Sequence, residues 1–180
     1  MSETPACIVL VGLMGAGKTS IGRKLADQLG MPFVDADEEI VAAAGCEIND
    51  IFEIYGEAAF RDVEARVIAR ILSEAPCVLA TGGGAFMNAE TRDAIAGNAV
   101  TVWLRAELDT LVQRTSRRND RPLLKTGDPR EILGRLMDER YPVYAEADIT
   151  VNTGDESIAD TVGRIADALK SHAAEVPADD

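Results

Sequence analysis

Short runs of apolar residues alternate along the chain with longer segments in which apolar residues recur every three or four positions. The apolar runs cover residues 6–12, 31–37, 77–81, 99–104 and 148–151. Runs of this length, each followed by a stretch of helical periodicity, predict buried strands separated by helices. The alternation is typical of an α/β fold of three layers (α/β/α), in which helices cover both faces of a five-stranded parallel sheet.

The longer segments predict the helices and the limits of the domain. They lie near residues 18–29, 38–72, 89–96, 107–115, 129–140 and 156–170. The second is broken near Gly45 and Gly56, and its last part carries an apolar stripe made by Phe60, Val63, Val67 and Ile71. We expect residues 1–172 to fold as one domain, and the acidic, proline-containing residues 173–180 to be disordered.

Charge and hydropathy narrow the class of protein. The chain of 180 residues has 18 basic and 31 acidic residues and a formal net charge of −13, which disfavours general nucleic-acid binding. No apolar run approaches the roughly 20 residues that a membrane span needs. The first apolar run leads directly into a glycine motif rather than a signal-peptide cleavage site, so we expect a cytoplasmic protein, and a compact acidic domain of this kind is expected to be a monomer.

The cysteine and histidine content restricts the available chemistry. The three cysteines are far apart and form no CxxC pair, which argues against a disulfide framework and a structural zinc site. Cys7 and Cys77 lie in apolar runs and are predicted to be core residues. The single histidine, His172, lies near the C-terminus. Acid–base chemistry is therefore expected to fall to carboxylates.

The segment "GLMGAGKT", residues 12–19, joins the first predicted strand to the first predicted helix and fits the pattern GxxxxGK[ST]. Glycines in such a P-loop let backbone N–H groups converge on phosphate oxygens at a helix N-terminus. The lysine would reach the β and γ phosphates, and the threonine hydroxyl would bind Mg²⁺. The predicted nucleotide contacts are Gly12, Gly15, Ala16, Gly17, Lys18, Thr19 and Ser20. The alternative is a glycine-rich turn with an incidental lysine.

Two aspartates end the second predicted strand, in "VDAD", residues 34–37. In an extended backbone Asp35 and Asp37 project to the same face. One carboxylate could then lie near a metal ion and the other near an acceptor hydroxyl. The alternative is that one aspartate caps the following helix.

Two further motifs carry candidate binding groups. In "GEAAFRDVE", residues 56–64, Arg61 could pair with Glu57 or Glu64 at helical spacing, or it could offer a planar guanidinium to a substrate carboxylate. Three glycines, residues 82–84, follow the third predicted strand. Because three successive glycines are costly in backbone entropy, we expect a substrate or phosphate contact there rather than a flexible loop.

Positive charge concentrates in "QRTSRRNDRPLL", residues 113–124, which holds Arg114, Arg117, Arg118 and Arg121. No apolar residue occurs between the first and the last of these arginines. The segment is therefore predicted to be a mobile excursion from the core. The alternative is a solvated basic loop.

Together and in this order, the motifs resemble those of the shikimate kinase family, P-loop kinases related in fold to the nucleoside monophosphate kinases. The resemblance runs from Ile8 to Asp148 and rests on "GLMGAGKTSIGRKLA", "DAD", "IFEIYGEAAFRDVE", "GGGA", "RPLL" and "RYPVYAEAD". It implies a P-loop NTPase fold with a substrate-binding helical segment at about 36–64 and a mobile lid at about 115–127. It also implies transfer of the γ-phosphoryl group of ATP, with Mg²⁺, to the 3-hydroxyl of shikimate, on the pathway to chorismate and the aromatic amino acids.

The resemblance implies roles for individual residues. Asp37 would hold shikimate hydroxyls and be the candidate base, and Asp35 would help to organise Mg²⁺. The shikimate carboxylate would be bound by Arg61 and Arg140. The substrate loop would be Gly82, Gly83 and Gly84.

Two arginines of the basic segment also match the family. Arg121 would be carried by the lid onto the phosphates and would act in catalysis with Lys18 and Asp37, and Arg114 would pack on the adenine. Arg117 and Arg118 are outside the family pattern and receive no role. The segment "VNTGDES", residues 151–157, also departs from the pattern where adenine contacts are expected.

Two other functions remain open at this point. A kinase of another hydroxylated acid, such as gluconate, would also need a carboxylate-binding arginine. A nucleotide-dependent regulatory switch would need only the P-loop, but the chain has no NKxD-type guanine signature.

Overall fold

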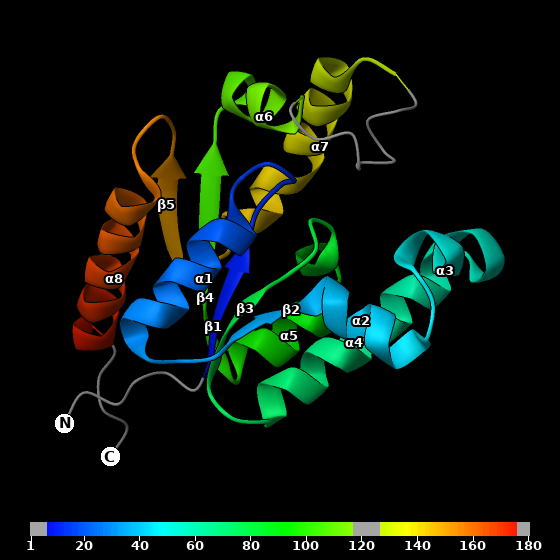
Figure 1. The fold of residues 1–180 in the computed structure, drawn as a ribbon, viewed down its shortest axis with the longest axis horizontal. Helices are drawn as coiled ribbons and strands as arrows, with labels where there is room; N and C mark the ends of the chain where they lie inside the picture. Colours follow the sequence, from blue (N-terminus) through cyan, green and yellow to red (C-terminus); the bar gives the residue numbers. More distant parts are fainter. Residues whose placement is uncertain (1–6, 117–126, 176–180) are drawn as a thin grey trace.

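The computed structural model describes residues 7–116 and 127–175, and in them a five-stranded parallel sheet lies between layers of helices (Figure 1). The spatial order of the strands is β2-β3-β1-β4-β5. Their bounds are Cys7–Val11 (β1), Phe33–Asp35 (β2), Cys77–Ala80 (β3), Ala99–Ala106 (β4) and Ile149–Thr153 (β5). The predicted three-layer α/β/α fold with a five-stranded parallel sheet is confirmed.

The central strand β1 explains why the apolar runs are continuous rather than alternating. All five of its residues are buried, because helices cover both faces of the sheet. Cys7 pairs in register with Cys77 of β3, and their Sγ atoms are 3.7 Å apart with no disulfide between them. Burial raises the pKa of the Cys77 thiol to about 12, so it stays neutral. The prediction that both cysteines are core residues is confirmed.

The helices form two layers, and further helices lie beside them in two places (Figure 1). Helices α1 (Lys18–Leu29) and α8 (Ile158–Glu175) pack together on one face, and α4 (Glu57–Ser73) and α5 (Ala89–Ala96) pack on the other. The remaining helical elements are α2 (Ala36–Ala44), α3 (Ile48–Tyr55), the 3₁₀ turn η1 (Ala85–Met87), α6 (Leu108–Thr115) and α7 (Pro129–Tyr144). Of these, α2 and α3 lie next to α4, and α6 lies next to α7. None of the described helices combines the length and the apolar character needed to cross a membrane.

Three predicted boundaries are wrong. Strand β2 ends at Asp35, and Asp37 lies in the first turn of α2, so the two aspartates do not share one extended strand. Helix α7 does not end before Pro142 but continues through it to Tyr144. Helix α8 extends to Glu175, so residues 173–175 are helical rather than disordered.

The first two corrections have a local physical reason. The Asp35 side chain accepts hydrogen bonds from the backbone N–H groups of Asp37 and Glu38, and this cap starts α2 immediately after the strand. The missing N–H of Pro142 removes one hydrogen bond from the last turn of α7, and complete burial of the Tyr144 side chain holds that turn in place.

The parallel arrangement decides where chemistry can occur. The P-loop follows β1, α2 follows β2, and the three glycines follow β3. Because β2, β3 and β1 are neighbours in the sheet, these three segments meet at one edge. The carboxyl edge of an open parallel sheet is where such folds bind ligands.

Candidate active site

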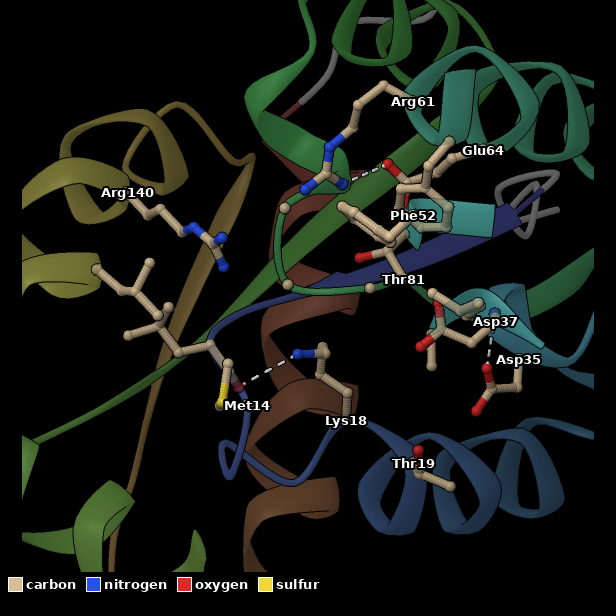
Figure 2. A pocket seen from close by; sticks show the side chains of 18 of the residues that line it. Met14, Lys18, Thr19, Asp35, Asp37, Phe52, Arg61, Glu64, Thr81 and Arg140 are labelled. Atoms are coloured by element: carbon tan, nitrogen blue, oxygen red, sulfur yellow. Dashed lines mark hydrogen bonds and ion pairs between the residues drawn. The ribbon is translucent and has the colours of Figure 1, made fainter. Parts of the chain in front are cut away.

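A cavity of ≈ 610 Å³ opens at this edge of the sheet. Its walls come from the P-loop, the β2–α2 junction, α3, α4, the glycine loop after β3, and α7 (Figure 2). Six of the predicted catalytic, metal-binding and substrate-binding side chains reach it, and they are Lys18, Thr19, Asp35, Asp37, Arg61 and Arg140.

The P-loop forms one wall, and its backbone is shaped by glycines. Gly12, Gly15 and Gly17 have φ values of 155°, 85° and 96°, which residues with a side chain rarely adopt. Helix α1 starts at Lys18 without a side-chain cap on its first N–H groups. An uncapped helix N-terminus beside backbone N–H groups favours a bound anion such as phosphate.

The side chains of the P-loop divide between the cavity and the core. Lys18 Nζ donates to the carbonyl oxygens of Gly12 (2.5 Å) and Leu13 (3.2 Å), so here it holds the loop's own backbone. Thr19 lines the cavity and is exposed, whereas Ala16 is buried beneath the loop. Ser20 is exposed and lines a neighbouring hollow.

The two aspartates lie together on the side of the cavity nearest Thr19 (Figure 2). Asp35 Oδ1 is 2.9 Å from the backbone nitrogen of Asp37, in the cap that starts α2. Asp35 therefore keeps its other carboxylate oxygen for a ligand, while Asp37 lies in the first turn of the helix. The predicted alternative that one aspartate caps the next helix is confirmed for Asp35, and both aspartates still line the cavity.

Arg61 enters the cavity from α4 and is held by two carboxylates. Its guanidinium is 2.8 Å from Glu64 Oε1 and 3.7 Å from Glu57 Oε1. The Glu64 side chain is only 2 % exposed. Burial raises the pKa of the Glu64 carboxyl, and the nearby Asp37 charge raises it further, while the charge and hydrogen bond of Arg61 lower it.

Arg140 approaches from α7, on the opposite side of the glycine loop from Arg61 (Figure 2). The two guanidinium groups converge on this loop. Arg61 is 25 % exposed and Arg140 is half-buried, so both can meet a ligand. A pair of converging guanidinium groups matches the geometry of a carboxylate.

The three glycines of the loop make room for these side chains. A Cβ on Gly82 would lie 3.1 Å from Asp37 Oδ1, and one on Gly83 would lie 3.0 Å from Arg140 Nη1. A Cβ on Gly84 would lie 2.8 Å from Arg61 Cζ. Each glycine therefore leaves space for one functional side chain from another element.

A second hollow of ≈ 430 Å³ lies on the other side of the P-loop. It is lined by the P-loop, the end of α6 and the loop between β5 and α8. Arg114 spans it: its guanidinium donates to the carbonyl oxygens of Gly15 (3.1 Å), Ala16 (3.3 Å) and Gly154 (2.7 Å). The arginine thus ties the P-loop to the β5–α8 loop, which holds residues 154–157 of the predicted departure "VNTGDES".

Some predicted residues are not brought to the cavity. Gly12 and Ala16 are buried within the P-loop and line neither hollow. Arg117, Arg118 and Arg121 lie outside the described residues, as does most of the predicted lid.

The sequence interpretation missed two residues that support the site. Glu64 was considered only as a surface partner of Arg61, although it lies four residues after Phe60 and three before Val67, inside the buried stripe of α4. A carboxylate in an apolar stripe is a signal that could have been used. Tyr144, buried behind the glycine loop, had no comparable signal because its partner is a distant backbone carbonyl.

Comparison with known proteins identifies the family. The family model described as shikimate kinase matches residues 14–170. A shikimate kinase from Mesorhizobium japonicum is 56 % identical over 165 residues, which cover 92 % of this chain and 81 % of that protein. One from Paramagnetospirillum magneticum is 58 % identical over 162 residues, covering 90 % and 83 % respectively. The chain belongs to the shikimate kinase family.

Solved structures agree with this assignment. A shikimate kinase from Acinetobacter baumannii in complex with shikimate superposes with a TM-score of 0.88 at 40 % identity, covering 94 % of this chain and 95 % of that one. A gluconokinase from Sinorhizobium meliloti reaches a TM-score of 0.57 at 20 % identity, covering 93 % and 97 %, which is a likeness of fold alone. The family resemblance inferred from the motifs is therefore confirmed.

Proposed function

We propose that this chain transfers the γ-phosphoryl group of ATP to the 3-hydroxyl of shikimate, giving shikimate 3-phosphate and ADP for chorismate and aromatic amino acid synthesis. The observation that carries the proposal is the convergence of Arg61 and Arg140 on the glycine loop, which lies beside the P-loop in the same cavity. It supports an acceptor that has one carboxylate and one reactive hydroxyl. Family membership makes shikimate the acceptor to test first.

The acceptor would bind through its two ends. Arg61 and Arg140 would take the carboxylate by charge-assisted hydrogen bonds, with Gly82, Gly83 and Gly84 providing close backbone. Asp37 would hold the hydroxyls and accept the proton of the attacking one. Because phosphoryl transfer passes through a loose transition state, positioning and electrostatics carry most of the rate, and a carboxylate of ordinary basicity suffices as base.

The nucleotide would bind on the P-loop. Backbone N–H groups from Gly12 to Ser20 and the α1 terminus would contact the phosphates. Lys18 would leave its carbonyl partners and reach the β and γ phosphates. Arg114 and the second hollow would receive the adenine, and Arg121 would meet the phosphates from the lid.

The residues beside the P-loop fit Mg²⁺. A hydroxyl and a carboxylate, those of Thr19 and Asp35, line the same cavity, and Mg²⁺ prefers oxygen ligands supplied by few side chains together with phosphate and water. We infer that these two residues hold the ion. It would neutralise charge that develops on the transferred phosphoryl group.

An ADP-release assay tests the proposal directly. Purified protein with MgATP is expected to release ADP when shikimate is added, with little release with gluconate or without an acceptor. Equal rates with and without shikimate would contradict the proposal, and equal rates with gluconate would contradict the choice of acceptor. A thermal-shift measurement with each ligand alone adds a test, because a nucleotide-dependent switch should not respond to shikimate.

A further inference from the structure

The last turn of α7 carries two residues that reach the glycine loop, and only one of them is accounted for by the proposed function. Arg140 and Tyr144 are four residues apart, so they lie on the same face of the helix. Arg140 lines the cavity. Tyr144 is completely buried and lies behind the loop, where it does not line the cavity.

The phenol of Tyr144 joins the loop to the arginine. Its hydroxyl donates a hydrogen bond to the carbonyl oxygen of Gly83. Arg140 lies near the same phenol, and its charge opposes the rise in the pKa of Tyr144 that burial causes. Gly83 is also the residue whose missing side chain leaves room for Arg140 Nη1. One hydroxyl therefore binds the backbone of the residue against which the Arg140 guanidinium lies.

The surroundings of the ring keep this hydroxyl in place. Trp103 and Phe86 pack near it, with ring centroids 5.8 Å and 6.5 Å from that of Tyr144. Burial raises the pKa of Tyr144 to about 12, and the charge of Arg140 opposes this rise. The phenol is thus a neutral donor near neutral pH.

We propose that Tyr144 is a positioning residue for the acceptor carboxylate: its hydroxyl holds the Gly83 carbonyl and the Arg140 guanidinium in one fixed arrangement. The residue does not touch the acceptor. It acts by fixing two groups that do, so that less conformational freedom is lost on binding. The role rests on the proposed function of the cavity.

The test compares two tyrosines of the same helix. Tyr144→Phe keeps the ring and removes the hydroxyl. Tyr141→Phe makes the same change at a hydroxyl that donates to the carbonyl oxygen of Ala106 on β4, outside the cavity, at 2.5 Å. Both rings contact Trp103 and both are kept in the variants, so packing against Trp103 should be preserved in each.

Tyr144→Phe is expected to raise the KM for shikimate about tenfold, with the KM for ATP and kcat changed by less than about threefold. Tyr141→Phe is expected to leave all three unchanged, and both variants should lose no more than about 2–4 °C of Tm. An unchanged KM for shikimate in Tyr144→Phe would overturn the role, as would an equal rise in Tyr141→Phe.

Crystal structures of the two variants separate this role from the proposed function. If the wild-type protein does not turn over shikimate, the proposed function fails, and the structures still decide whether Tyr144 positions Arg140. The Arg140 guanidinium is expected to leave Gly83 in Tyr144→Phe and to keep its place in Tyr141→Phe. The same position in both variants would overturn the role.

Discussion

Two glycine-rich loops lie at neighbouring strand ends, and they use glycine for different physical reasons. In the P-loop after β1, Gly12, Gly15 and Gly17 have φ values between 85° and 155°. In the loop after β3, none of the three successive glycines has a positive φ. The first loop needs glycine for its backbone conformation. The second needs it for space, because Asp37, Arg140 and Arg61 each approach one of its residues.

The difference predicts how each loop responds to substitution. A side chain in the P-loop would strain the backbone whatever lies around it. A side chain in the loop after β3 would adopt an ordinary conformation and would displace one specific neighbour. Substitutions in the two loops should therefore have separable effects on the KM for shikimate and on the KM for ATP.

The largest effect is expected from substitution of Asp37, the carboxylate that approaches Gly82. Asp37→Asn should lower kcat by about 10²–10⁴-fold with little change in Tm, because the amide cannot accept the acceptor's proton. Steady-state kinetics and thermal melts measure both quantities. Glu38→Gln, the adjacent exposed residue on α2, serves as the control and should keep full activity. Near-wild-type turnover in Asp37→Asn would remove Asp37 as the base.

Gly84→Ala should displace Arg61. The added Cβ would lie 2.8 Å from Arg61 Cζ, closer than van der Waals contact allows. The guanidinium is the flexible end of the side chain, so it can move aside at little cost in stability. Loss of its charged hydrogen bond to the acceptor, about 1.5–3 kcal/mol, is expected to raise the KM for shikimate about 10- to 100-fold. The KM for ATP should stay within about twofold. Gly97→Ala is the matched control, since its Cβ would meet nothing closer than 3.9 Å.

Gly15→Ala should strain the P-loop after β1. The residue has φ 85°, and a Cβ would lie 2.9 Å from Thr115 Cγ2. We expect unfolding free energy to fall by about 1–2 kcal/mol and the KM for ATP to rise several-fold. Denaturant melts and kinetics with each substrate varied in turn would measure this. A parallel rise in the KM for shikimate would contradict the separation of the two loops.

The smallest effect concerns the pH dependence of stability. Because burial raises the pKa of Glu64 in the folded protein, its contribution to stability is fully present below the pKa of the unfolded chain, near 4.5. That contribution is lost as pH rises through the higher folded value. The unfolding free energy of wild type minus that of Glu64→Gln should therefore decrease as pH rises from 4.5. Melts of both proteins across this range test the sign, and a difference that grows with pH would contradict it.

The strands and the P-loop could be predicted because their signals are local. Continuous apolar runs mark strands covered on both faces, and the spacing of Gly12, Gly17 and Lys18 is set within one strand–helix junction. The end of β2 could not be placed because the Asp35 side chain stops the strand with a cap, and an aspartate in "VDAD" is equally compatible with an extended strand.

The contacts between distant residues that support the site were harder to predict from the sequence. Arg61 was given two alternatives, and the structure shows that they are compatible: its guanidinium pairs with Glu57 and Glu64 and still faces the cavity. The contact between Tyr144 and Gly83 joins residues 61 positions apart through a backbone oxygen, which no side-chain pattern encodes.

Arg114 makes the wall of the second hollow tolerant of side-chain changes, and the glycine loop after β3 lacks this tolerance. Its guanidinium is held mainly by main-chain carbonyl oxygens, of Gly15, Ala16 and Gly154, and every residue type supplies such an oxygen. The loop between β5 and α8 can therefore change its side chains while the wall of the hollow keeps its shape. A change of the exposed Asp155 side chain in this loop is therefore expected to be nearly neutral, whereas a side chain added in the glycine triplet would displace Asp37, Arg140 or Arg61.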